Sequence, residues 1–560
     1  MDPQTLAAIL LSACRNDPQR PAIHLVSAHG GDLVIRRSDL IRGAAGVAQQ
    51  LASVGIRPGD VVVLILYPDR TLIEWFFGTI LHGAIPSILP FLTEKLQPGV
   101  YRRSLQALAA VTRPRAIACH PDFLDEVTGV IPEQAADPAL ILEVTGPASA
   151  CDPVIERTVP QRQAEDVVLL QHSSGTTGLQ KGVALSHQAV LRQLENYTHV
   201  LGLRDEDVVV SWLPLYHDMG LIAGFILPVL CGVPLVMISP FDWVRAPHRL
   251  FQAVSKRGGT LTWLPNFAYN FCAQKIRPRE LEGVDLSSLR AVINCSEPIH
   301  WRSHELFLNR FAPYGLAESS LASCYAMAEN VFAVTQSALG SPPRLNRIDR
   351  RAYQADLTIR PPSGDTDPLV HVSSGRPLAN VEVRILDAGR QDLPDAHLGE
   401  IAIRSDCMLT EYYRRPDLTG QTFLEGWYLT GDLGYLDDGE LFVTGRKKDL
   451  IIIGGKNIYP HDIEVLAGEV RGIHPGRIVA FGVFNEGSGT EDAVVVAESD
   501  TEEASARARL ADEIRRTVTQ GSDLALRYVE IVDRGWLIKT SSGKIARSAN
   551  RAKYLERFRS

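Results

Sequence analysis

The chain has 560 residues, of which 45% are hydrophobic and 22% are charged. This length predicts roughly two to four globular units, and the composition supplies apolar side chains for their cores and excludes overall disorder. The net charge is −8, with 57 basic residues dispersed among 65 acidic ones. No basic face that could neutralise phosphates is predicted, so nucleic acid is not expected as a partner.

The cysteines are far apart in the sequence and form no C-x-x-C pair. This spacing argues against a zinc site and a disulfide framework, and it favours the reducing cytoplasm as the location. No stretch has the ~18–20 uninterrupted apolar residues that a membrane span requires. The eight cysteines are Cys14, Cys119, Cys151, Cys231, Cys272, Cys295, Cys324 and Cys407.

The N-terminus contains an apolar stretch, residues 6–11, followed by Ser12-Ala13-Cys14, which could pass for a lipoprotein cleavage site. A targeting signal begins with basic residues, whereas residues 1–5 contain none. The stretch is therefore predicted to be an amphipathic helix that opens the globular fold.

Short β-branched runs and helix-length segments alternate through the first 300 residues. Buried strands that alternate with helices indicate α/β layers with mainly parallel sheets. The runs are residues 61–66, 167–170, 235–238 and 291–293, and the helical segments include 40–53 and 70–82.

The pattern changes near residue 381 to closely spaced strands, which predict a small β-rich subdomain at about residues 375–445. Beyond Asp449 a second α/β stretch begins. We predict a large N-terminal domain of layered α/β subdomains, residues 1–446, and a small mobile C-terminal α+β domain, residues 447–560. Residues 337–367 are rich in Pro, Arg and Asp, have weak periodicity, and are predicted to form an inserted surface element.

The strand at 167–170 leads into a loop rich in glycine and hydroxyl groups. Glycines let backbone N–H groups approach an anion, hydroxyls add donors and a lysine adds positive charge, so the loop suits a polyphosphate. Its spacing differs from G-x-x-x-x-G-K-[ST], and a solvated turn is the plain alternative. The loop reads Ser173-Ser174-Gly175-Thr176-Thr177-Gly178-Leu179-Gln180-Lys181-Gly182.

This loop resembles the phosphate-binding signature of the adenylate-forming superfamily, which includes acyl-CoA synthetases, fatty-acyl-AMP ligases and peptide-synthetase adenylation domains. Further motifs resemble those of the superfamily, in the same order, over most of the chain. The resemblance implies an enzyme that uses ATP and Mg²⁺ to convert a carboxylic acid, here a fatty acid, into an acyl-AMP and pyrophosphate. The acyl group then passes to a thiol.

Two segments resemble the parts of the family that hold the acid and the adenine. Residues 212–220 resemble the acid-binding segment, which implies substrate-binding roles for Trp212, His217, Asp218 and Gly220 and a catalytic role for His217; a lone His-Asp pair is otherwise most often structural. Ser296, Glu297 and Pro298 follow the strand at 291–293 and resemble the stretch whose backbone lies along the adenine. Without the resemblance they would be an ordinary exit from a strand.

The family also has an aromatic-x-x-x-Glu element, in which the ring packs on adenine and the carboxylate holds Mg²⁺. Two segments compete for this role. Tyr314–Glu318 has the more familiar letters, but residues 310–315 resemble a stretch that precedes the motif in fatty-acyl-AMP ligases. We therefore choose the second segment, in which Tyr325, Ala326 and Met327 contact the nucleotide and Glu329 is the catalytic metal ligand; Glu318 is the alternative.

The remaining motifs surround the predicted domain boundary and the C-terminus. Asp432 resembles the acidic residue that binds the ribose hydroxyls, although Gly-Asp is also common in turns. Arg446 is implied near the ribose or phosphate, and Lys448 at the hinge. Residues 453–460 resemble the loop that swings toward the active site for thiol transfer, and Lys544 resembles the catalytic lysine.

The implied mechanism depends on positioning and charge neutralisation, because the acid and ATP are both anions. The 173–182 loop, including Lys181, would grip the β- and γ-phosphates, and Lys544 would lie between the carboxylate and the α-phosphate. Rotation about Lys448 would then withdraw Lys544 and present residues 454–460 to the thiol.

Three features resemble fatty-acyl-AMP ligases, which load acyl-carrier proteins: the long segment between Glu329 and Ser373, residues 263–269 and residues 217–220. Residues 454–458 instead resemble the acyl-CoA synthetase loop. We expect a carrier protein as acceptor, with free CoA as the alternative. A non-catalytic nucleotide or acyl sensor is disfavoured because the charged residues of every motif are present, and a phosphotransferase because the loop lacks the usual spacing.

Overall fold

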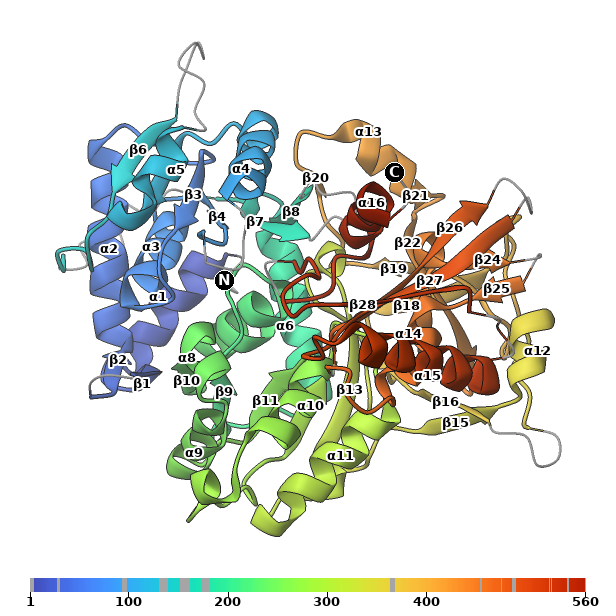
Figure 1. The fold of residues 1–560 in the computed structure, drawn as a ribbon. Helices are drawn as coiled ribbons and strands as arrows, with labels where there is room; N and C mark the ends of the chain where they lie inside the picture. Colours follow the sequence, from blue (N-terminus) through green and yellow to red (C-terminus); the bar gives the residue numbers. More distant parts are fainter. Residues whose placement is uncertain are drawn as a thin grey trace.

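A computed structural model describes residues 5–27, 31–92, 98–129, 139–151, 162–173, 181–362, 368–453, 456–474, 476–485, 490–522, 524, 526–540 and 543–558. The protein is a mixed α/β structure with several sheets and a small C-terminal domain, coloured orange to red in Figure 1. Among the described residues, no helix is long and apolar enough to cross a membrane.

The largest sheet has nine strands in the order β17-β14-β13-β12-β11-β9-β10-β1-β2. Its middle strands are parallel and wholly buried, as expected for strands covered on both faces. Helices α9 (His248–Arg257), α10 (Asn266–Lys275) and α11 (Trp301–Phe311) lie beside it (Figure 1). The strands are β1 Pro21–Val26, β2 Leu33–Arg36, β9 Val209–Ser211, β10 Leu235–Ile238, β11 Leu261–Leu264, β12 Ala291–Asn294, β13 Leu321–Ala326, β14 Ala333–Gln336 and β17 Arg376–Pro377.

A second, parallel sheet near the N-terminus has the order β4-β3-β5-β6. Alternate side chains of β3 enter two cores: Val62 and Leu64 pack with helices α2 and α3, whereas Val61 and Val63 pack with α4. The elements are β3 Val61–Ile65, β4 Ile85–Ile88, β5 Ala116–Cys119, β6 Leu140–Glu143, α2 Arg37–Ser53, α3 Arg70–Leu81 and α4 Pro98–Thr112. The predicted opening helix is also present, as α1 (Leu6–Asn16).

The β-rich region is an antiparallel sheet of five strands: β18 (Val381–Leu386), β19 (Gly399–Ser405), β21 (Phe423–Leu424), β22 (Trp427–Asp437) and β23 (Glu440–Arg446). Asp438 and Gly439 connect β22 to β23 with φ values of 53° and 72°, the backbone that a two-residue hairpin turn requires. A β-bulge at Leu433/Gly434 then shifts the register by one residue, so that Asp432 lies opposite Arg446.

The C-terminal domain is built on β26 (Ile478–Asn485), β27 (Thr490–Glu498) and β28 (Tyr528–Val532). Helices α14 (Pro460–Gly468) and α15 (Ala504–Ser522) cover one face of this sheet, and α16 (Arg547–Phe558) covers the other. The hairpin of β24 (Ile451–Ile453) and β25 (Lys456–Ile458) precedes α14.

The segment predicted as a surface insertion also contributes to a core. Strand β15 (Leu345–Ile348) pairs with β16 (Leu369–Val372), and Asp349 caps helix α12 (Arg350–Ala355). Ile348 and Tyr353 are fully buried, in a cluster that includes Tyr459 of the C-terminal domain. The prediction missed this packing because two isolated apolar residues give no measurable period.

Candidate functional site

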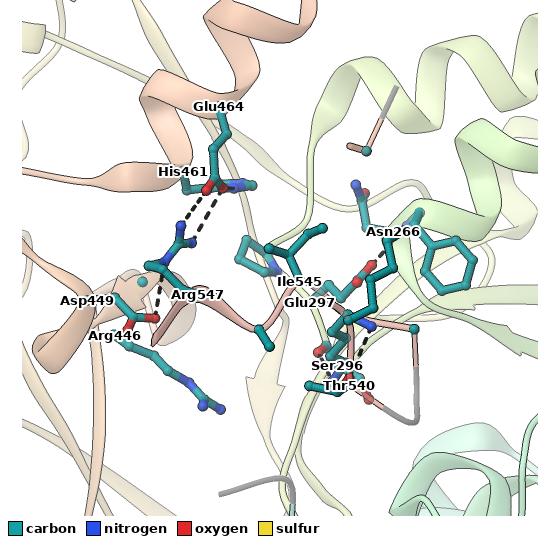
Figure 2. A pocket seen from close by; sticks show the side chains of 18 of the residues that line it. Asn266, Ser296, Glu297, Arg446, Asp449, His461, Glu464, Thr540, Ile545 and Arg547 are labelled. Carbon is teal, nitrogen blue, oxygen red and sulfur yellow. Dashed lines mark hydrogen bonds and ion pairs between the residues drawn. The ribbon is translucent and has the colours of Figure 1, made fainter. Parts of the chain in front are cut away.

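A cavity of about 810 Å³ lies between the large sheet, the β-rich sheet and the C-terminal domain (Figure 2). Its wall contains predicted site residues from several separate segments of the chain after residue 290. These are Ser296, Glu297, Pro298, Tyr325, Ala326, Asp432, Arg446 and Lys544. Predicted residues that are described but lie outside the wall are Lys181, Trp212, His217, Asp218, Gly220, Met327, Glu329 and Lys448.

Lys544 reaches from the C-terminal domain into the large domain. Its Nζ donates a hydrogen bond to the carbonyl of Ser296 at 2.7 Å and lies 3.4 Å from His217 Nε2. The backbone of the lysine is paired with that of Thr540, whose N–H donates to the Lys544 carbonyl at 2.7 Å. Burial lowers the pKa of Lys544, and the nearby Glu297 and Asp218 carboxylates oppose that shift.

His217 is oriented by the residue that follows it. Its Nδ1 lies 2.6 Å from Asp218 Oδ1, and the same carboxylate oxygen accepts from the Met219 N–H at 2.7 Å, so Nε2 is the ring nitrogen that faces Lys544. Burial would raise the pKa of Asp218, but His217 and Lys544 hold it below its usual value. Gly220 is required sterically, because a Cβ there would lie 2.3 Å from the Pro214 carbonyl oxygen.

Trp212 lies in the core rather than at the cavity. Its ring stacks on Trp243 with a centroid distance of 3.5 Å and an angle of 5° between the planes, and it is 4% exposed. Its contact with the acid therefore stays a prediction.

The predicted adenine loop follows β12 and connects to α10. Ser296 has a left-handed backbone with φ of 68°, which is uncommon for a residue with a Cβ. Glu297 Oε2 accepts from the Phe267 N–H at 2.9 Å, so this side chain caps the first turn of α10. One oxygen of the Glu297 carboxylate is thus engaged by the protein itself.

Tyr325, Asp432 and Arg446 form one polar group at the end of β13 and across β22 and β23. The Tyr325 hydroxyl donates to Asp432 Oδ2 at 2.6 Å, and Arg446 Nε donates to Asp432 Oδ1 at 3.1 Å. Burial keeps the pKa of Tyr325 well above its usual value, so its hydroxyl remains a donor. A buried carboxylate beside an aromatic ring suits a ribose with its adenine.

Glu329 lies in a short 3-10 helix, Ala328–Asn330, and is partly buried. Its Oε1 accepts from the Tyr412 hydroxyl at 2.8 Å, and Lys181 Nζ lies 4.7 Å from the centroid of the Tyr412 ring. Burial raises the pKa of Glu329. The competing Glu318 is exposed, in the 3-10 helix Glu318–Ser320, and is not part of the cavity wall.

The arrangement around Glu329 fits Mg²⁺ of the kind that bridges substrate phosphates, which needs only one or two protein carboxylates. The described residues contain no group of three or more His, Cys, Asp or Glu side chains that could hold a metal alone.

Most of the predicted phosphate loop lies outside the described residues, namely Ser174, Gly175, Thr176, Thr177, Gly178 and the Ser173 side chain. The flanking strands, β7 (Val167–Ser173) and β8 (Lys181–Ser186), pair with each other.

The predicted hinge residue, Lys448, is exposed in a 3-10 helix, Lys447–Asp449, directly after β23. In Figure 2, Arg547 lies between Asp449 and Glu464; Arg547 Nε is 3.6 Å from Asp449 Oδ2, and the guanidinium also pairs with Glu464. In the loop expected to face the thiol, residues 454 and 455 lie outside the described part.

Sequence reasoning missed a pair of histidines across the domain interface. The rings of His300, before α11, and His461, in α14, have centroids 4.0 Å apart. Burial, with a smaller contribution from His461, holds the pKa of His300 well below its usual value. The sequence offers one signal for them: His461 directly follows the motif at 453–460, and His300 lies two residues after Pro298.

The low pKa of His300 predicts acid sensitivity. A buried neutral histidine takes up a proton on unfolding, so stability is lost as pH falls below about 6.5, by up to ~1.4 kcal/mol per pH unit for this one group. In His300→Phe the drop in melting temperature between about pH 7.5 and 5.5 should be smaller than in wild type. His199→Phe, at an exposed position on α6 (His187–Leu201), is the control; equal drops in all three proteins would contradict the prediction.

The AMP-binding enzyme family matches residues 12–413, and the chain belongs to this family. The protein is therefore an AMP-forming ligase that uses ATP, which confirms the class and the fold predicted from the motifs.

Three relatives show the range of similarity. The chain is 31% identical to the long-chain-fatty-acid–AMP ligase FadD26 of Mycobacterium marinum, over 93% of this chain and 91% of that protein. It is 29% identical to the putative fatty-acid–CoA ligase fadD25 of Mycobacterium tuberculosis, over 91% and 90%. A solved structure from a study of fatty acyl-adenylate ligases of E. coli and L. pneumophila superposes with a TM-score of 0.90 and 26% identity, covering 100% of this chain and 98% of that one.

Proposed function

We propose that the protein activates a fatty acid as acyl-AMP, with release of pyrophosphate, and transfers the acyl group to the phosphopantetheine thiol of an acyl-carrier protein. The observation that carries the first step is the position of Lys544, 2.7 Å from the Ser296 carbonyl oxygen and 3.4 Å from His217 Nε2. A cation is thereby held at the junction of the predicted acid-binding and adenine-binding segments.

In adenylate formation, a carboxylate oxygen of the acid bonds to the α-phosphorus of ATP as the bond to pyrophosphate breaks. No proton needs to move, so the enzyme must hold two anions together and offset their repulsion. Lys544 supplies positive charge at that point, and Asp432 accepts hydrogen bonds from the ribose. Glu329 would hold Mg²⁺, which when bound neutralises charge on the phosphates.

Transfer to the thiol requires the small domain, residues 447–560, to move relative to residues 1–446. The side chains that connect the two in this conformation include polar pairs that a rotation about Lys448 would separate: Lys544 with Ser296, His300 with His461, and Arg302 with Glu469. This rotation would withdraw Lys544 and expose residues 454–460 to the thiol.

The preference for a carrier protein is supported by the inserted segment that contains α12. The ring centroid of its Tyr353 lies 5.3 Å from that of Tyr459, which is at the end of the loop that would face the thiol. The relatives include both a fatty-acid–AMP ligase and a putative fatty-acid–CoA ligase, so the acceptor must be measured.

The test incubates the protein with ATP, Mg²⁺ and a fatty acid, together with either free CoA or a phosphopantetheinylated carrier protein. We expect AMP, pyrophosphate and an acyl-carrier thioester, and little acyl-CoA. The same carrier without its phosphopantetheine is the control. Acyl-CoA as the main product would refute the acceptor, whereas ADP in place of AMP would refute the whole reaction.

A further inference from the structure

The loop that accepts the hydrogen bond from Lys544 is held at both ends by one side chain, Asn266. Asn266 Oδ1 accepts from Asn294 Nδ2 at 3.1 Å, just before the loop, and from the His300 N–H at 3.2 Å, just after it. Asn266 Nδ2 donates to Ser303 Oγ in α11 at 3.2 Å. A single amide therefore bridges the two ends of residues 295–299.

The position of Asn266 follows from the sheet. Strands β11 and β12 are parallel, with Leu264 opposite Asn294, so their carboxyl ends reach the same edge. Asn266 comes two residues after Leu264, at the start of α10, and is 7% exposed. The next residue, Phe267, donates its N–H to Glu297 in the middle of the loop. Asn266 and Glu297 lie at one wall of the cavity in Figure 2.

The loop needs this support because its backbone is not in a relaxed conformation. Ser296 has φ of 68°, an unfavourable backbone conformation for a non-glycine residue, which persists only where the surrounding structure imposes it. The same residue presents the carbonyl that holds Lys544 Nζ. If the loop relaxed, the carbonyl would turn and the lysine would lose its anchor.

We propose that Asn266 is a positioning residue for adenylate formation, which acts by fixing the Ser296 carbonyl that anchors Lys544. Asn266 is assigned no direct contact with the reacting atoms. The proposal rests on the role proposed for Lys544, and it makes a further demand: Asn266 matters for the half-reaction in which Lys544 is docked and not for thiol transfer, in which Lys544 is withdrawn.

The test measures the two half-reactions separately in Asn266→Ala. We expect kcat for ATP–pyrophosphate exchange to fall by about 10–100-fold, the effect of losing buried hydrogen bonds at a reacting centre, with a smaller change in KM for ATP. Acyl transfer from supplied acyl-AMP should stay within about twofold of wild type. Asn196→Ala, which removes a partly exposed asparagine of α6 that is not part of the cavity wall, is the control.

Two further variants distinguish positioning from general stability. Asn266→Asp keeps an oxygen that can accept from Asn294 and His300, so it should restore much of the exchange rate. Ser303→Ala breaks only the third hydrogen bond and should have the smaller effect. Melting temperatures show whether each variant is folded.

Three outcomes would overturn the proposal: both half-reactions falling together, exchange unchanged in Asn266→Ala, or a rise in KM for ATP without a fall in kcat. The failure of the proposed function is recognised separately, because it would appear as absence of exchange in the wild-type protein or as full exchange in Lys544→Ala.

Discussion

Lys544→Ala is expected to abolish measurable adenylate formation, a loss of at least about 10²–10³-fold, while acyl transfer from supplied acyl-AMP is largely retained. The reason is that the ammonium group lies between the segments predicted to hold the two anionic reactants, and alanine leaves their repulsion uncompensated. ATP–pyrophosphate exchange measures the first step, and thioester formation from synthetic acyl-AMP measures the second.

Lys275→Ala is the matched control, since this exposed lysine lies at the end of α10. Exchange near the wild-type rate in Lys544→Ala would show that the contact with Ser296 and His217 is not catalytic. Equal loss of both steps would instead show that the substitution damages the fold.

Asp432→Asn is expected to raise KM for ATP by about 10–100-fold, because hydrogen bonds to a charged group contribute about 1.5–3 kcal/mol. Each carboxylate oxygen already faces a donor, Tyr325 Oη on one side and Arg446 Nε on the other. The amide nitrogen of asparagine must therefore face one of these donors, which disturbs the ribose site without changing its shape.

The measurement is pyrophosphate release at saturating acid and varied ATP. Asp438→Asn is a suitable control, because Asp438 lies in the hairpin turn of the same two strands, is highly exposed, and has a positive φ that asparagine tolerates. An unchanged KM for ATP in Asp432→Asn would remove Asp432 from the nucleotide site.

Much of the fold could be predicted because its strands are buried on both faces. Residues 235–238 form β10 as predicted, and the other buried runs match β3, β7 and β12 to within a few residues. Burial on both faces gives a continuous apolar run, which sequence patterns detect well. The insertion around α12 was predicted less well because its core contribution is two separate residues, Ile348 and Tyr353.

The candidate site could be predicted as a set of motifs but not as a geometry. His217 and Ser296 lie 327 and 248 positions before Lys544 in the sequence, and only the order of the motifs suggested that the three residues meet. Asn266 and the pair His300 and His461 were missed because their roles depend on how strand ends and domains are placed in space. No local sequence pattern encodes that placement.

The one-residue shift between β22 and β23 brings the predicted ribose site close to the predicted hinge. Because of the shift, the carboxylate expected to hold the ribose forms an ion pair with Arg446, and the predicted pivot, Lys448, follows only two residues later. A sugar bound at Asp432 would restrict the motion of Arg446 and of the hinge that follows it, and departure of the sugar would restore that motion. We therefore expect product AMP to keep the small domain from returning to its starting orientation, so that each catalytic cycle ends only when the nucleotide leaves.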